Sequence, residues 1–120
     1  MLMDQQNSVV EKIVKVLDSK KGMDIRVLDI RGLSVLADYF VIVTGSSDRQ
    51  VQALADNVEE ELDKEGVYPI NKEGYNTAEW VLLGYDDVIV HIFQRETREF
   101  YGLEHVWQDA PEVDITGLLV

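Results

Sequence analysis

The segment Gly45-Ser46-Ser47 has the residue types of an anion-binding turn, because it follows an apolar run and precedes a helical pattern. Free backbone N–H groups at the start of a helix can bind a phosphate group. The glycine-rich fingerprints for dinucleotides and nucleoside triphosphates need further glycines or a Gly-Lys-Ser/Thr sequence, and neither is present. Ser47 followed three residues later by Gln50 is typical of a capping box. We therefore interpret the turn as a helix cap.

Carboxylate pairs are the second candidate for chemistry. Nucleotidyltransferases combine a Gly-Ser turn with two metal-holding aspartates on a nearby strand, whereas Asp56 and Glu59 lie inside the helical pattern that follows the turn. Two-metal phosphoryl transfer needs carboxylates that converge on one point. Asp86 and Asp87 are adjacent, but a catalytic pair would need two environments that separate its pKa values, and a turn needs nothing more. We predict neither a phosphoryl-transfer site nor a catalytic carboxylate pair.

The histidines of the chain are His91 and His105, and there is no cysteine. Disulfides and thiolate metal sites are thereby excluded, and no short spacing of histidines indicates a zinc site. As a general base, His91 would need a nucleophile or an orienting carboxylate beside it. No such residue stands at a sequence spacing that indicates a catalytic pair. We predict no catalytic residue, no metal and no cofactor, and interpret His91 as a half-buried interface residue.

Two apolar runs joined at Asp86-Asp87 position His91, and they predict a β-hairpin over residues 79–93. Residues paired across a hairpin share a face of the sheet. The first face is expected to carry Tyr85 with Val88, Leu83 with Val90 and Val81 with Ile92. The second face is expected to carry Trp80 with Phe93, Leu82 with His91 and Gly84 with Ile89. Helices cover only one sheet face in a two-layer domain, so we expect another molecule to cover the second face.

Hydrophobic periodicity predicts the element order α-β-β-α-β-β-β-α, an α/β (α+β) fold with one mixed sheet covered by helices. We expect Asn7 or Ser8 to cap the first helix, and Gly22 to end it in the left-handed conformation. The second helix is expected from Ser47 to Gly66, with one buried stripe: Val51, Leu54, Ala55, Val58 and Leu62. The strands expected outside the hairpin are 25–30, 39–44 in the centre of the sheet, and 67–70, before a polar loop over 71–78.

The C-terminal part is predicted to form one helix from about Thr97, with Phe100 and Trp107 in the core, and residues 109–111 end it. A chain of 120 residues is long enough to bury one core. We expect a single domain over residues 1–108 and a C-terminal tail over 109–120.

The charge of the chain limits its partners. The net charge is −12, from 11 basic and 23 acidic residues. Residues 61–120 hold 4 basic and 13 acidic residues, a net of −9, so the acidity is concentrated in the half with the hairpin. Such a surface repels DNA phosphates and speeds encounter with a basic protein. No apolar run has the length of a membrane span and the first residues do not resemble a signal peptide, so we expect a cytoplasmic protein.

The sequence resembles the ribosomal silencing factor S family, also called Iojap or YbeB-like, from about Val10 to Trp107. The residues that carry the resemblance are Leu28-Asp29-Ile30, Ala37 to Val51, Ala55 to Val58, Glu73-Gly74, Trp80 to Leu83, Asp87 to Phe93 and Arg98 to Trp107. Where the family commonly has Asp-x-Gly-Asp-Val at the hairpin turn, this chain has Gly84-Tyr85-Asp86-Asp87-Val88. Asp86 thus replaces a glycine, and Gly84 replaces an acid.

The resemblance implies a nucleotidyltransferase-like fold without the catalytic residues and a protein that is not an enzyme. It implies a translational repressor that binds the fourteenth protein of the large ribosomal subunit and blocks joining of the small subunit, with a homodimer as the free form. Together with the second face of the predicted hairpin, it predicts these partner-binding residues: Trp80, Leu82, Ile89, His91, Phe93 and, at the edge, Tyr101. The alternatives are a nucleotide-binding enzyme that uses the Gly45-Ser46-Ser47 turn, and a simple dimerisation module.

Overall fold

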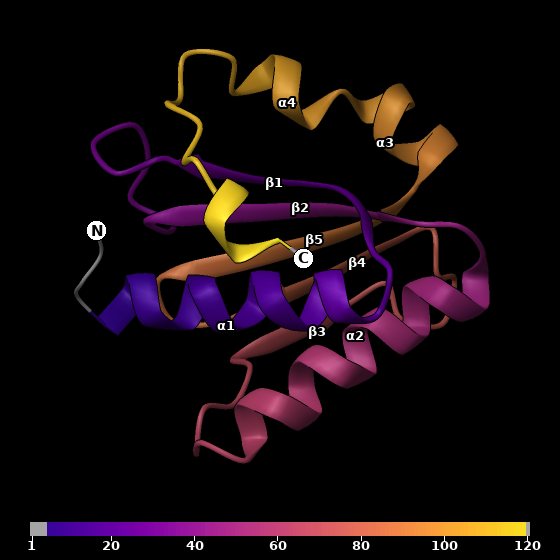
Figure 1. Cartoon of the computed structure of the whole chain (residues 1–120). Coiled ribbons are helices and arrows are strands. Elements are labelled where there is room, and N and C mark those ends of the chain that lie inside the picture. Colours follow the sequence, from indigo (N-terminus) through magenta and orange to yellow (C-terminus); the bar gives the residue numbers. More distant parts are fainter. Residues whose placement is uncertain (1–4, 120) are drawn as a thin grey trace.

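The computed structural model describes residues 5–119, which form one five-stranded sheet with helices on both faces (Figure 1). The elements are α1 (Gln5–Ser19), β1 (Met23–Asp29), β2 (Tyr39–Gly45), α2 (Asp48–Asp63), β3 (Asn71–Glu73), β4 (Trp80–Gly84), β5 (Val88–Gln94), α3 (Arg95–Tyr101), α4 (Leu103–Val106) and a 3₁₀ turn (Thr116–Leu118). None of the helices in this part of the chain is both long and apolar enough to span a membrane.

The sheet has the strand order β1-β2-β5-β4-β3. β2 and β5 run parallel, and the other neighbouring pairs are antiparallel. Every residue of β2 is buried, as expected for the predicted central strand. The mixed sheet of the predicted α+β class is therefore confirmed.

The β4–β5 hairpin has the predicted register, from Trp80 opposite Phe93 to Gly84 opposite Ile89. The backbone N–H of Tyr85 donates to the carbonyl of Val88 at 2.8 Å and closes the two-residue turn. Among the described residues, positive φ outside glycine occurs only at Lys21, Asp24 and Ala78, so the turn aspartates are unstrained. An aspartate therefore fits at position 86 without the freedom of a glycine.

The larger core lies between the sheet and the helices α1 and α2, which cover one face. The predicted stripe of α2 is buried in full, and this confirms the helical spacing: Val51, Leu54, Ala55, Val58 and Leu62. The backbone N–H of Gln50 donates to Ser47 Oγ at 3.1 Å, which confirms the predicted cap.

The second face of the sheet is covered in large part by the chain's own C-terminal segment, so the expectation that another molecule must cover it was wrong. Phe93 is fully buried in a second apolar cluster with Phe40 and Ile42, and Trp107 packs edge-on against Phe40 at 5.3 Å between ring centroids. The fold has three layers, with α3 and α4 above the sheet and α1 and α2 below it (Figure 1). The assumption of two layers caused the error.

The predicted C-terminal helix is interrupted at Gly102, which has φ 55° and ψ 44°. A left-handed residue ends a helix, so α3 stops at Tyr101 and the short α4 begins in a new direction. The interruption leaves Phe100 81% exposed, although one continuous helix predicted it to be buried. Trp107 does contact the core, as predicted.

Strand 67–70 was also predicted wrongly, because the edge strand β3 begins only at Asn71, within the expected polar loop. Tyr68 and Ile70 are largely exposed, and Val67 N–H still bonds to the carbonyl of Leu62 in the turn that ends α2. Pairing with β4 begins where Ile70 N–H donates to the carbonyl of Gly84 at 2.6 Å. Apolar residues alone did not locate the strand, because this edge is open to solvent.

The ends of α1 differ from the prediction as well. The helix already includes Asn7 and Ser8, so neither is its cap. At the other end Lys21, with φ 67°, takes the left-handed position predicted for Gly22. Gly22 is needed for another reason: a Cβ there would lie 2.7 Å from Val43 Cγ2.

Residues 109–119 follow the free edge of β1 and then reach α1. Asp29 N–H donates to the carbonyl of Pro111 at 2.9 Å, and Val113 N–H donates to the carbonyl of Val27 at 2.8 Å. Ile115 is buried in the larger core, beside the 3₁₀ turn that Figure 1 shows next to α1. Residues 27–29 at this sheet edge are thereby paired, which shortens the edge that could otherwise pair with another chain.

Candidate partner-binding site

The predicted partner-binding residues do come together, and Trp80 lies at their centre. The indole ring of Trp80 has its centroid 4.8 Å from that of Phe93 and 5.0 Å from that of Tyr101. Its Nε1–H donates to Nδ1 of His91 at 3.1 Å. Leu82 is the direct cross-strand partner of His91, so side-chain alternation places it on the same face.

The six residues divide into an accessible layer and a buried one. Trp80, Leu82 and Ile89 are half-buried at the sheet surface, and Tyr101 on α3 is 53% exposed. His91 and Phe93 lie beneath them, and His91, only 4% exposed, is buried and not half-buried as predicted, because Phe40 and Trp80 pack against its ring. The first four residues can touch a partner directly, whereas His91 and Phe93 can act only through their neighbours.

Phe100 belongs to the same surface, but it was not predicted as a site residue from the sequence. Its ring meets that of Tyr101 edge-on at 5.1 Å between centroids, and it is the most exposed aromatic side chain next to the site. A glycine at position 102, near the end of a helical pattern, is the usual signal of a helix end. Taking that signal into account would have placed Phe100 outside the core. We use the name aromatic face for these accessible residues: Trp80, Leu82, Ile89, Phe100 and Tyr101.

His91 is neutral in this environment. Burial lowers its pKa to about 4. Because Nδ1 accepts the indole N–H, the imidazole proton belongs on Nε2. Nε2 is buried and has no hydrogen-bond partner within residues 5–119, and no group of three metal-binding side chains occurs in that range. Neither a general base nor a metal site is supported.

Arg98 fixes α3 and α4 above the sheet and so sets the position of Tyr101. Its guanidinium donates to both carboxylate oxygens of Glu104, at 2.8 and 2.9 Å. It also donates to the carbonyl of Asp24 at 2.9 Å and to Thr44 Oγ1 at 2.7 Å. The Arg98 hydrogen bond holds the pKa of Glu104 below its usual value. This clamp joins α4 and α3, which carries Phe100 and Tyr101 of the aromatic face, to β1 and β2.

The Gly45-Ser46-Ser47 turn is closed by its own chain. Ser46 N–H donates to Gln50 Oε1 at 2.5 Å, and the carboxylate of Asp48 accepts a hydrogen bond from the side chain of Gln94. The donors that an anion would need are partly used, and a negative charge stands beside them. This geometry fits the predicted cap.

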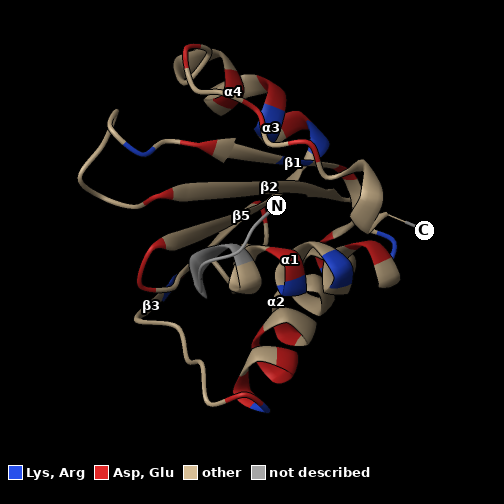
Figure 2. Ribbon diagram, turned by 60° about the vertical axis from the view of Figure 1, so that its left-hand side comes forward, with Lys and Arg blue, Asp and Glu red and all other residues tan. Residues whose placement is uncertain are grey.

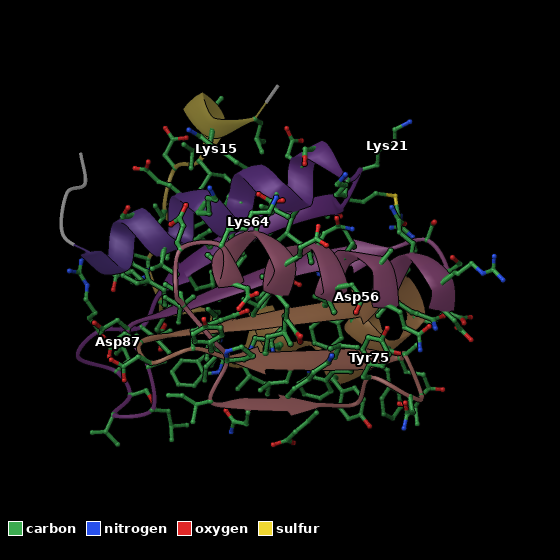
Figure 3. The ribbon with its side chains drawn as sticks, turned by 90° about the horizontal axis from the view of Figure 1, so that it is seen from below. Lys15, Lys21, Asp56, Lys64, Tyr75 and Asp87 are labelled. Atoms are coloured by element: carbon green, nitrogen blue, oxygen red, sulfur yellow. The ribbon has the colours of Figure 1, made fainter. Side chains whose placement is uncertain are left out.

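The acids of α2 are also engaged elsewhere. Tyr75 OH donates to Asp56 at 2.9 Å, and Figure 3 shows the two side chains near each other between α2 and the loop before β4. Glu59 forms an ion pair with Lys72 at 3.0 Å. Both carboxylates lie on a helix, as predicted, and they do not converge with strand acids as two-metal catalysis requires.

Three exposed acids lie next to residues of the aromatic face, either across the sheet or along the chain, and we call them the acidic rim: Glu73, Glu79 and Glu99. Glu73 pairs with Leu82 across β3 and β4, Glu79 precedes Trp80, and Glu99 precedes Phe100; all three acids are exposed. Figure 2 shows further acids on the C-terminal helices, on the same side of the sheet, and along α2, on the opposite side. Position 84, where the resemblance implied an acid, is a glycine, and the Asn71 side chain occupies the space where a Cβ of residue 84 would lie. The site therefore has an apolar centre and an acidic rim.

Comparison with known proteins identifies relatives over nearly the whole chain. A family model described as "Ribosomal silencing factor during starvation" matches residues 3–119. Ribosomal silencing factors of Bacillus subtilis and Haemophilus influenzae are 41% and 45% identical, over 92% and 83% of this chain and 93% and 98% of theirs. A crystal structure from Chromobacterium violaceum, 36% identical, superimposes with a TM-score of 0.84 over 88% of both chains. A mouse protein named for mitochondrial assembly of the ribosomal large subunit is 27% identical over 82% of this chain and 44% of its own length.

Proposed function

The chain belongs to the ribosomal silencing factor family, and we propose that it represses translation by binding the large ribosomal subunit and blocking its joining with the small subunit. The name of the mouse relative, which refers to assembly of the large subunit, supports the choice of subunit. The proposal places the protein in the cytoplasm. Blocking by occlusion needs only bulk and a docking face.

The docking face in this proposal is the aromatic face, and its partner is the fourteenth protein of the large subunit. The observation that carries the assignment is the apolar centre around Trp80 within an acidic rim. Aromatic residues at the centre with polar residues around them are typical of protein interfaces. Ribosomal proteins are basic because they bind RNA, so an acidic rim is complementary to such a partner.

The proposal includes no catalysis. It is supported by the self-capped Gly45-Ser46-Ser47 turn and by the helical position of Asp56 and Glu59. The proposal also includes a homodimer as the free form, because exposed apolar side chains such as Phe100 and Val35 are of the kind that self-association buries.

Sedimentation with purified ribosomal subunits tests the proposed function. We expect the protein to sediment with large subunits and not with small subunits, and to reduce the formation of joined ribosomes in proportion to its amount up to equimolar. Added nucleotide should not change the inhibition. Inhibition by a small fraction of the equimolar amount would indicate turnover and would favour the enzyme, whereas dimerisation without any binding to large subunits would favour the dimerisation module.

The acidic rim predicts that salt slows association with the isolated ribosomal protein. Exposed charges are screened beyond a Debye length of about 10 Å at 0.1 M salt, so electrostatic steering weakens as salt is added. Stopped-flow measurements should show an association rate that falls with salt and a dissociation rate that changes less. A variant with Glu73, Glu79 and Glu99 changed to glutamine serves as the control and should lose much of the salt dependence. An association rate of the parent that ignores salt would contradict steering.

A further inference from the structure

We propose that His91 is a positioning residue, which holds Trp80 in its docking orientation through the indole hydrogen bond without touching the partner. The proposal rests on the proposed function, because it assumes that Trp80 contacts the ribosomal partner. It assigns a role to the buried side chain of His91, for which the fold itself needs no histidine.

Strand geometry brings the two residues together. Side chains alternate along β4 and β5, so Trp80 and His91 project from the same face of the hairpin. Phe93 is the direct cross-strand partner of Trp80, and His91 is its diagonal neighbour, within reach of an aromatic side chain. In the structure, the ring centroids of Trp80 and His91 are 5.8 Å apart.

The hydrogen bond selects one orientation of the indole ring. The ring contacts with Phe93 at 4.8 Å and Tyr101 at 5.0 Å involve no polar atom of the indole, whereas a ring turned over about the Cβ–Cγ bond would move Nε1 away from His91. The bond from Nε1–H to His91 Nδ1 at 3.1 Å turns the polar edge of Trp80 inward. The accessible part of the ring is then apolar, which suits a desolvated interface centre.

Stability alone does not account for a histidine at this position. The ring lies among aromatic side chains, with Phe40 edge-on at 4.7 Å, and its Nε2 is buried without a partner. A buried donor without a partner costs stability, and a leucine in the same cluster would carry no such cost. Burial lowers the pKa of His91 to about 4, so Nδ1 remains a hydrogen-bond acceptor at neutral pH. Beyond its packing against Phe40, which another apolar side chain could supply, the residue contributes an acceptor for Trp80.

Two substitutions separate positioning from packing. His91→Leu keeps an apolar filling but removes the acceptor, whereas His91→Asn retains an oxygen close to the place of Nδ1. We expect His91→Leu to weaken binding to purified large subunits by about tenfold, the effect of one lost hydrogen bond. Its urea midpoint should stay close to that of the parent, because removal of the unpaired Nε2–H offsets the loss of the acceptor for the Trp80 indole. His91→Asn should restore binding to within about threefold of the parent.

Trp80→Phe provides the matched test, because it keeps an aromatic ring and removes the donor. In the Trp80→Phe background, His91→Leu should no longer change the binding affinity, because there is no indole N–H to position. A further readout needs no substitution at position 91: the Trp80 indole N–H of the parent should exchange with solvent at least about tenfold more slowly than that of free tryptophan.

The outcomes distinguish failure of this proposal from failure of the proposed function. Equal binding by the parent and His91→Leu, with binding lost in Trp80→Ala, would overturn positioning and leave the docking face intact. Equal binding by the parent and Trp80→Ala would overturn the docking face itself. If His91→Leu does not fold, fast exchange of the Trp80 indole N–H in the parent or weak binding by a folded His91→Asn would still overturn the proposal.

Discussion

Replacing Trp80 by alanine is expected to weaken binding to the large ribosomal subunit by about thirtyfold or more, equivalent to about 2 kcal/mol, if Trp80 is the central contact of the interface. The expectation follows from its place in the aromatic face. Trp80 is half-buried in the free protein, it contacts Tyr101 and Phe93, and it is surrounded by side chains that would exclude water when a partner docks. Sedimentation with purified large subunits at a range of protein concentrations measures the loss.

Val90→Ala is the matched control for Trp80→Ala. Val90 lies on the same hairpin but faces the larger core, where it is fully buried, so its truncation should lower the stability of the fold by about 1 kcal/mol or more. The folded fraction of Val90→Ala should still bind. Trp80→Ala should lose binding with a smaller change in thermal stability. Unchanged sedimentation of Trp80→Ala with large subunits would show that the docking face has been placed wrongly.

The hairpin could be predicted from the sequence because several independent constraints agreed. Side chains alternate between the two faces along each strand, and the short polar segment at Asp86 and Asp87 marks the turn. The register of Trp80 with Phe93 followed from these two facts. The buried stripe of α2 followed in the same way from the spacing of its apolar residues and the cap at Ser47. In each case the pattern and the local backbone signal indicate the same structure.

The cover of the second sheet face could not be predicted from those patterns, because it depends on where the C-terminal chain turns. One left-handed residue, Gly102, divides the expected helix. Arg98 on α3 then binds Glu104 on α4 and also donates to β1 and β2, so both helices lie over these strands. The partners of Arg98 are up to 74 residues away in the sequence, and no periodicity indicates a contact of that kind. For the same reason the burial of His91 became visible only in the structure, whereas the exposure of Phe100 had a signal in Gly102.

The Arg98 clamp accordingly carries the prediction with the largest effect on stability. Arg98→Met should lower the free energy of unfolding by about 3 kcal/mol, because it leaves Glu104 and the groups that accept from Arg98 on β1 and β2 without their buried donor. Arg26→Met is the matched control, since Arg26 also pairs with Glu104, at 3.3 Å, but is largely exposed, and its loss should change the unfolding free energy by less than about 1 kcal/mol. Urea unfolding measures both variants. Equal effects of the two substitutions would contradict a buried clamp.

The pH dependence of the same pair gives the clamp a second, independent test. The hydrogen bond from Arg98 lowers the pKa of Glu104 in the folded protein below the ordinary glutamate value of 4.5. A lowered folded-state pKa means that the pair stabilises the fold above pH 4.5, and that this contribution is lost as the pH falls through the folded pKa. The parent should therefore lose stability more steeply than Arg98→Met on acidification below that pH. If the free energy of unfolding falls equally with pH in the two proteins, Arg98 does not stabilise the charged form of Glu104. Another contact would then have to anchor α3 and hold Tyr101 beside Trp80.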